Sequence, residues 1–235
     1  MIKFFRKIRR NLLSKGKTRE YLKYGFGEII LVVIGILIAV QINNWNIDRQ
    51  NEEKEILYLT RLTTNLGSDK RLYEYIIKED SLLIAELKAI QNDIANHIQT
   101  INQPVEDFKF LTKGYKFGSN RTVIDNLISS GQIELLRSNY LVENILVYYR
   151  QTEHNEATID ATIKAQNSRT INDLILKFNS NNKKDSSYIE ILKNYIHFRI
   201  YLIEQQLESY TSQKIRAEKL IDKINKEIYY IETVY

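Results

Sequence analysis

The sequence predicts an all-α protein with one membrane-spanning helix near its N-terminus, followed by an elongated, antiparallel bundle of long helices. Three observations support this fold class. The 235 residues include one proline and eight glycines, so few residues interrupt a helix. One stretch near the N-terminus is apolar over about the thickness of a bilayer. The rest of the chain repeats apolar residues at the three-to-four spacing of a helix.

The apolar stretch lies within residues 24–45, YGFGEIILVVIGILIAVQINNW. Every residue from position 29 to position 40 is apolar or glycine, and Glu28 is the only charged residue between positions 24 and 42. A helix over positions 24–42 rises roughly 28 Å, close to the hydrocarbon core of a bilayer at about 30 Å. Aromatic residues flank the run, as in interfacial belts. We therefore predict a transmembrane helix over residues 24–45, and the alternative is a buried core helix.

Residues 1–23 form a basic tail. The tail contains nine lysines and arginines and one acidic residue, Glu20, so its net charge is +8. Phe5, Ile8 and Leu12 recur at helical spacing, with basic residues on the other faces. The tail is either an amphipathic helix on the membrane surface or a basic segment that only sets the topology. The basic residues expected at the membrane surface are Lys3, Arg6, Lys7, Arg9 and Arg10.

The charge distribution predicts the orientation of the span. The positive-inside rule puts the basic tail in the cytoplasm and residues 46–235 on the other side of the membrane. No small-residue cleavage site follows the apolar run, so we predict an uncleaved signal anchor and not a secretory signal peptide.

One side of the span has a pattern of its own. Glu28, Gly35, Ala39 and Ile42 are separated by seven, four and three positions, so they lie on one side of a helix. Gly35 and Ala39 form a small-xxx-small pair, which lets two helix backbones approach closely. We predict this side as a helix-packing face. Two alternatives remain for Glu28, a place at headgroup level or proton handling as in single-span stator subunits.

Residues 46–101 are predicted as a long helix. Gly67 is a point where this helix could bend or break, and Pro104 follows its predicted end. The apolar stripe consists of Ile56, Leu59, Leu62, Leu66, Leu72, Ile76, Leu83, Leu87, Ile90, Ile94 and Ile101.

Shorter elements are expected in the middle of the chain. Residues 105–120 are rich in aromatics and are expected to be a packed connection. A short helix over residues 121–130 is expected to end at Gly131 in the left-handed conformation. We expect Leu135 and Leu136 to be buried, and Ser138 or Asn139 to cap a helix over residues 139–178. Residues 151–170 of that helix are polar, so we expect looser packing there.

Residues 187–234 are predicted as the last helix, which begins with a capping box and has the clearest period. Two apolar rows make a stripe wider than the seam of a two-stranded coiled coil, which favours an antiparallel bundle. A self-associating coiled coil is the alternative. The first row is Ile189, Ile196, Ile203, Tyr210, Ala217, Ile224 and Ile231, and the second is Ile200, Leu207, Ile221 and Ile228.

The sequence contains no motif typical of catalysis or of cofactor binding. It has no cysteine, which excludes disulfides and thiolate metal sites. The histidines His97, His154 and His197 lie far apart, and the residues around His154 are better explained as a solvated helix face than as metal ligands. Ser129 and Ser130 are better explained as a helix end than as nucleophiles. We therefore expect no enzyme and no cofactor.

Nucleic acid is not an expected partner. Residues 44–235 hold 25 basic and 27 acidic side chains, a net charge of −2. A domain that is nearly neutral lacks the positive charge that attracts phosphate backbones.

Three segments, MIKFFRKIRRNLL, GEIILVVIGILIAVQINNWN and LISSGQIELL with YLVENILVYYR, resemble a bacterial family of single-pass membrane-anchored proteins. That family is catalogued only as a domain of unknown function. The resemblance implies a Gram-negative single-pass protein with an external helical domain. Together with the predicted orientation, we expect an inner-membrane protein with a cytoplasmic N-terminus and a periplasmic domain. No activity is established for the family, so the resemblance implies no catalytic residues.

Together these patterns favour a scaffold or interaction protein of the bacterial envelope. The expected partners are membrane lipid and either other envelope proteins or a second copy of the chain, which the span and the helical domain would contact. Two alternatives are a ligand-sensing helical bundle that acts through a membrane partner and a proton-coupled, stator-like subunit.

Overall fold

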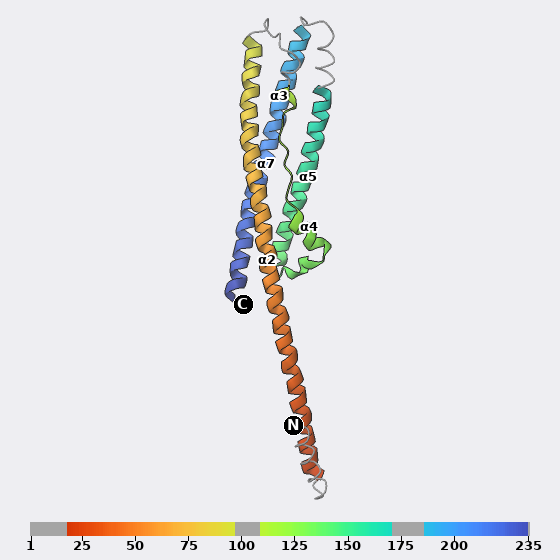
Figure 1. The fold of residues 1–235 in the computed structure, drawn as a ribbon. Helices are drawn as coiled ribbons and strands as arrows, with labels where there is room; N and C mark the ends of the chain where they lie inside the picture. Colours follow the sequence, from red (N-terminus) through yellow and green to blue (C-terminus); the bar gives the residue numbers. More distant parts are fainter. Residues whose placement is uncertain (1–17, 97–108, 171–185, 235) are drawn as a thin grey trace. The chain divides into compact units, whose positions relative to one another are not determined.

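The computed structural model describes residues 18–96, 109–170 and 186–234. All regular elements in these ranges are helical, which confirms the all-α prediction (Figure 1). The chain divides into two compact units, Met1–Lys54 and Glu55–Tyr235. The elements are α2 (Thr18–Asn96), α3 (Lys109–Thr112), α4 (Thr122–Ser129), the 3-10 helix η2 (Gln132–Leu135), α5 (Asn139–Thr170) and α7 (Ser186–Val234).

The described part of the first unit is the N-terminal portion of α2. Its residues 29–50 are all exposed. Within the described ranges, one helix is long and apolar enough to cross a membrane. Its most apolar 18-residue window has a mean hydropathy of 2.4, and none of that window is buried. This confirms the long apolar N-terminal helix.

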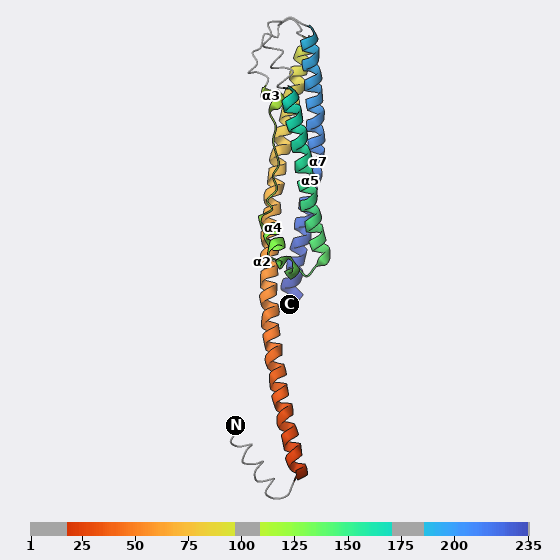
Figure 2. The same cartoon turned by 90° about the vertical axis from the view of Figure 1, so that its right-hand side faces the viewer.

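The second unit contains the rest of α2, which lies beside α5 and α7 in both views (Figures 1 and 2). α2 continues through Gly67 without a break. A single glycine costs a helix only about 1 kcal/mol relative to alanine, and the burial of Leu62 and Leu66 just before it holds α2 in place. The predicted end of this helix near Pro104 lies outside the described residues.

Three hydrophobic clusters make the core of the second unit. The first joins Leu59, Leu62 and Leu66 of α2 to side chains of α4, α5 and α7. The second joins the end of α2 to α3 and to the first half of α7. The third is aromatic: the rings of Tyr73 and Phe117 stack with centroids 3.8 Å apart, and Tyr210 packs against both. The core is therefore shared by helices that are distant in the sequence.

The predicted apolar rows of the last helix are confirmed. In the first row Ile189 is half-buried and all later members are buried, from Ile196 to Ile231. In the second row Ile200 is buried, and the other members are partly buried against the clusters. Because the side chains of one row lie on one face of α7, this face supplies the core along the whole helix.

The turn after α4 follows the prediction. Gly131 has φ 70°, the left-handed conformation. The hydroxyls of Ser129 and Ser130 donate to the carbonyl of Asn126, at 3.2 and 2.7 Å, so both serines belong to the helix end.

The start of α5 also follows the prediction, with one correction. Ser138 Oγ accepts a hydrogen bond from the backbone N–H of Leu141 at 3.3 Å, so Ser138 is a cap of α5. Leu136 is buried, but Leu135 is only half-buried, so the expectation for Leu135 is wrong. Leu135 is the last residue of η2, and successive side chains there point in different directions.

Two predictions fall partly outside the described residues. These are the end of the helix over residues 139–178 and the side chains of the capping box at the start of α7. In the predicted connection over residues 105–120, Phe117 is buried and Tyr115 is half-buried.

Residues 113–121 connect α3 to α4 without regular secondary structure and run alongside the long helices (Figures 1 and 2). A buried backbone outside a helix or sheet needs other hydrogen-bond partners. Helix side chains provide them here. Arg199 donates to the carbonyl of Lys113 at 2.7 Å, and Gln206 donates to that of Tyr115 at 2.9 Å.

The same segment is bound further along by acidic side chains. Glu156 of α5 accepts from the backbone N–H of Ser119 at 2.9 Å, and Asp69 of α2 accepts from that of Asn120 at 2.8 Å. α2, α5 and α7 therefore all hold this segment through polar side chains.

Candidate functional site

The predicted packing face of the span lies on α2 in the first unit. Gly35, Ala39 and Ile42 are exposed, with Ile42 at 60%, and Glu28 is half-buried. A Cβ added at Gly35 would meet nothing within 4 Å in this chain, so the surface there is open to a second helix. The packing face stays a prediction. The basic residues predicted at the membrane surface, Lys3, Arg6, Lys7, Arg9 and Arg10, lie outside the described residues.

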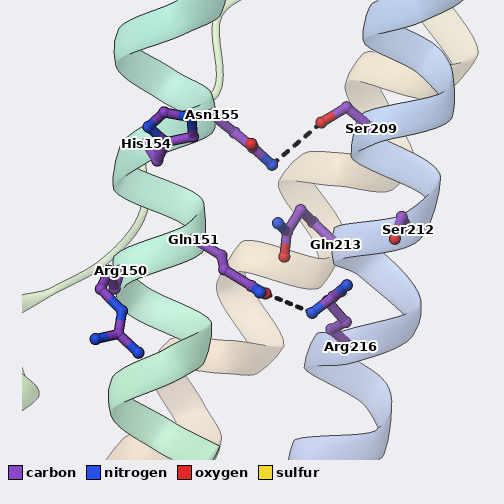
Figure 3. A pocket seen from close by; sticks show the side chains of 8 residues that line it. All are labelled: Arg150, Gln151, His154, Asn155, Ser209, Ser212, Gln213 and Arg216. Carbon is purple, nitrogen blue, oxygen red and sulfur yellow. Dashed lines mark hydrogen bonds between the residues drawn. The ribbon is translucent and has the colours of Figure 1, made fainter.

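A polar cleft lies between α5 and α7 in the second unit (Figure 3). Its volume is about 550 Å³, within the usual range for small-molecule sites. Two arginines, a histidine, three side-chain amides and two serines line it. They are Arg150, Gln151, His154 and Asn155 of α5, and Ser209, Ser212, Gln213 and Arg216 of α7. No carboxylate is among these lining residues.

Helical spacing brings these side chains together. The α5 residues occupy two adjacent pairs four positions apart, and the α7 residues are separated by three, one and three positions. Each set therefore lies on one face of its helix. Looser packing over residues 151–170 stays a prediction, and two residues of this stretch, Gln151 and Asn155, form hydrogen bonds to α7.

Two hydrogen bonds cross the cleft. Asn155 Nδ2 donates to Ser209 Oγ at 3.2 Å, and Arg216 donates to Gln151 Oε1. Gln213 extends from α7 toward α5 between these two bonds (Figure 3). Gln213 is 5% exposed, and its Oε1 accepts no hydrogen bond within the described chain. Buried polar atoms in folded proteins nearly always have a hydrogen-bond partner. The unpaired oxygen of Gln213 therefore indicates that a bound molecule could donate a hydrogen bond to it in the cleft.

Two of the three histidines, His154 and His197, lie within the described ranges. His154 lines the cleft and is exposed, His197 is exposed elsewhere on α7, and His97 lies outside the described residues. Glu153, the neighbour of His154 in the sequence, pairs with Arg121 at 3.1 Å. In the described ranges, no group of three or more histidine, cysteine or acidic side chains could hold a metal ion.

A second polar cluster surrounds Arg199 of α7, which is 1% exposed. Its guanidinium donates to Gln166 Oε1 of α5 at 3.1 Å as well as to the carbonyl of Lys113. Asp80 of α2 is equally buried, and this burial raises its pKa to about 7 although the positive charge of Arg199 lowers it. The cluster joins three helices, and its groups are too enclosed to meet a solute.

Sequence reasoning missed both polar sites. The polar composition of residues 151–170 was the available signal for the cleft, because it interrupts the apolar stripe of α5. No local pattern marked Arg199 or Asp80, since their partners are distant in the sequence.

Comparison with known protein families gives a match over most of the chain. A family model described as "Family of unknown function (DUF6090)" matches residues 28–202. No curated protein and no solved structure matches the chain.

Proposed function

The chain belongs to this family of unknown function, whose model covers most of its length, and we propose that it is a single-pass membrane protein that acts as a scaffold. In this proposal α2 anchors the chain in the bacterial inner membrane, with residues 1–23 in the cytoplasm. The helices of the second unit form an antiparallel bundle in the periplasm, where they contact other envelope proteins.

The exposed apolar part of α2 carries the proposal. Between positions 29 and 42 its side chains are aliphatic or glycine except for Gln41, and all are exposed. Soluble proteins rarely expose a contiguous apolar surface of this extent, because its contact with water is unfavourable. A lipid bilayer removes that cost along the whole helix, whereas a single partner helix covers only one side of it.

Membrane extraction tests the anchor. The native chain is expected to stay in the membrane pellet at alkaline pH and to be released by detergent. Replacing Ile34, Leu37 and Ile38 with lysine is expected to move it to the soluble fraction, because charged side chains are costly within a bilayer. Release of the native chain by alkaline washing alone would disprove the anchor.

The absence of cysteine from the sequence makes orientation measurable. A Ser129→Cys variant is expected to react with a membrane-impermeant maleimide in intact spheroplasts. A Ser14→Cys variant is expected to react only after permeabilisation. The reverse pattern would overturn the proposed orientation and leave the anchor itself intact.

The scaffold role is supported by the long exposed helix faces of the second unit, which suit helix-in-groove or bundle contacts. Mild crosslinking in cells, followed by purification of the intact chain, is expected to capture envelope proteins or a second copy. A lone monomer in detergent gel filtration, with no co-purifying protein, would count against the scaffold. We propose no catalytic activity.

Ligand sensing is the second candidate function. The polar cleft between α5 and α7 favours it, because a ligand bound there would contact both helices. The stator-like alternative rests on Glu28 alone. If a Glu28→Gln variant changed no energised process of the envelope, the stator-like alternative would be disproved.

A further inference from the structure

We propose that the cleft between α5 and α7 is a binding site for a small hydroxylated dicarboxylate. The inference is independent of the membrane anchor and of the scaffold role, because it rests on residues of the second unit alone. Three features carry it: the charge of the lining, the oxygen of Gln213 and the volume of the cleft.

The lining is positively charged. Arg150 stands on the α5 wall and Arg216 on the α7 wall, and no carboxylate is among the lining residues to neutralise them. A guanidinium presents a planar fork of donors that matches a carboxylate. Arg216 extends from α7 toward α5, whereas Arg150 lies along the side of α5 that is turned away from α7 (Figure 3). The flexible side chain of Arg150 would turn into the cleft to bind the second carboxylate of a solute. Asn155, Ser209 and Ser212 add donors that an anion can use.

Gln213 specifies a further group on the solute. Its side chain projects into the cleft, and its Oε1 lacks a hydrogen-bond donor (Figure 3). A plain dicarboxylate has only acceptors and would leave this oxygen unpaired. A hydroxyl can donate to Gln213 and accept from a neighbouring donor. An ammonium could also donate, but Arg150 and Arg216 would repel its charge. A hydroxyl is therefore the expected donor.

The volume is sufficient for such a solute. A cleft of about 550 Å³ holds a four-carbon acid together with ordered water. Arg216 already bonds to Gln151, so binding exchanges this neutral acceptor for a charged one, which makes a stronger hydrogen bond.

Calorimetric titration of the full chain in detergent tests the site with three acids of one carbon skeleton. L-malate carries a hydroxyl, succinate carries hydrogen, and L-aspartate carries an ammonium at the same carbon. L-malate is expected to bind with saturation and about two- to ten-fold more tightly than succinate, the contribution of one neutral hydrogen bond. It is expected to bind more tightly than L-aspartate and than inorganic phosphate.

Variants locate the site. Arg150→Gln and Arg216→Gln are each expected to weaken L-malate binding about ten-fold or more. Arg61→Gln, an exposed arginine of α2 outside the cleft, should leave it unchanged. Gln213→Leu should leave succinate binding as it is and abolish the preference for L-malate. If Gln213 had only a structural role, its substitution would change the affinities for L-malate and succinate equally.

Several results would overturn the proposal. They are the absence of saturable L-malate binding at concentrations of about 10 mM, equal affinity for L-malate and phosphate, and L-aspartate binding as tightly as L-malate. Binding that survives both arginine substitutions would also overturn it. If either variant loses its helical circular dichroism, the comparison of the three acids on the native chain and on Gln213→Leu decides the question.

Discussion

The hydroxyl of Tyr148 on α5 donates a 3.0 Å hydrogen bond to Oδ2 of Asp69 on α2, 79 positions away in the sequence. The other oxygen of Asp69 accepts from the backbone N–H of Asn120. Burial raises the pKa of Asp69, and these two hydrogen bonds lower it. Asp69 is thus the point at which α2, α5 and the connecting segment over residues 113–121 are held together.

Removal of the Asp69 carboxyl is expected to destabilise the second unit. Asp69→Ala leaves the buried hydroxyl of Tyr148 and the N–H of Asn120 without their acceptor, which costs about 1–3 kcal/mol or more. Asp69→Asn keeps an acceptor for one of them and should cost less. Thermal unfolding of the full chain in detergent, followed by far-UV circular dichroism, measures both. Asp93→Ala, at an exposed position of α2, is the control, and an equal loss there would contradict the prediction.

Asp80 is expected to make stability fall as the pH rises. Its pKa is about 7 in the folded chain and 3.8 as the ordinary value, so between these values the folded state binds the proton more tightly than the unfolded state. The stabilising contribution is complete below pH 3.8 and is lost as the pH rises through about 7. Its size is on the order of a few kcal/mol.

Asp80→Asn isolates this effect because the amide does not titrate. The free energy of unfolding of the native chain, minus that of the variant, should decline from about pH 4 to about pH 7 and then level off. Denaturant titrations at a series of pH values measure it. A difference that stays flat, or rises with pH, would show that Asp80 is ionised in the folded chain throughout.

A side chain at Gly114 is expected to destabilise the second unit. A Cβ there would lie 2.7 Å from Nη2 of Arg199, the atom that donates to the carbonyl of Lys113. Gly114→Ala should therefore displace a buried guanidinium and cost about 1–3 kcal/mol. Gly118 provides a matched control, because a Cβ there would meet nothing within 4 Å. Equal midpoints for Gly114→Ala and Gly118→Ala in thermal unfolding would contradict the placement of Arg199.

Gly35 is expected to permit close pairing of the span. If Gly35 and Ala39 let two copies of α2 approach, Gly35→Leu should hold the helices apart and reduce the crosslinked dimer several-fold. Gly27→Leu makes the same substitution on a different face of α2, where a Cβ also meets nothing within 4 Å in this chain. Quantitative crosslinking in membranes compares them. Equal dimer yields for the two variants would show that Gly35 does not belong to the packing face.

The sequence by itself determined the helical elements. α4, its left-handed glycine at Gly131, the cap at Ser138 and the buried rows of α7 were all predictable. Each depends on residues within a few positions of one another, because helix periodicity, capping and left-handed turns are local properties of the chain. The long apolar start of α2 was predictable for the same reason.

Only the tertiary structure decided which polar residues are buried and what they hold. Arg199 bonds to Lys113, 86 positions away, and Gln213 reaches the cleft only because α5 lies beside α7. A polar side chain is buried where a distant segment offers it a partner, and nothing in its own neighbourhood indicates that partner. The burial of apolar side chains follows from their spacing along one helix. The polar cleft and the hydrogen bonds that hold residues 113–121 form only where several helices pack together.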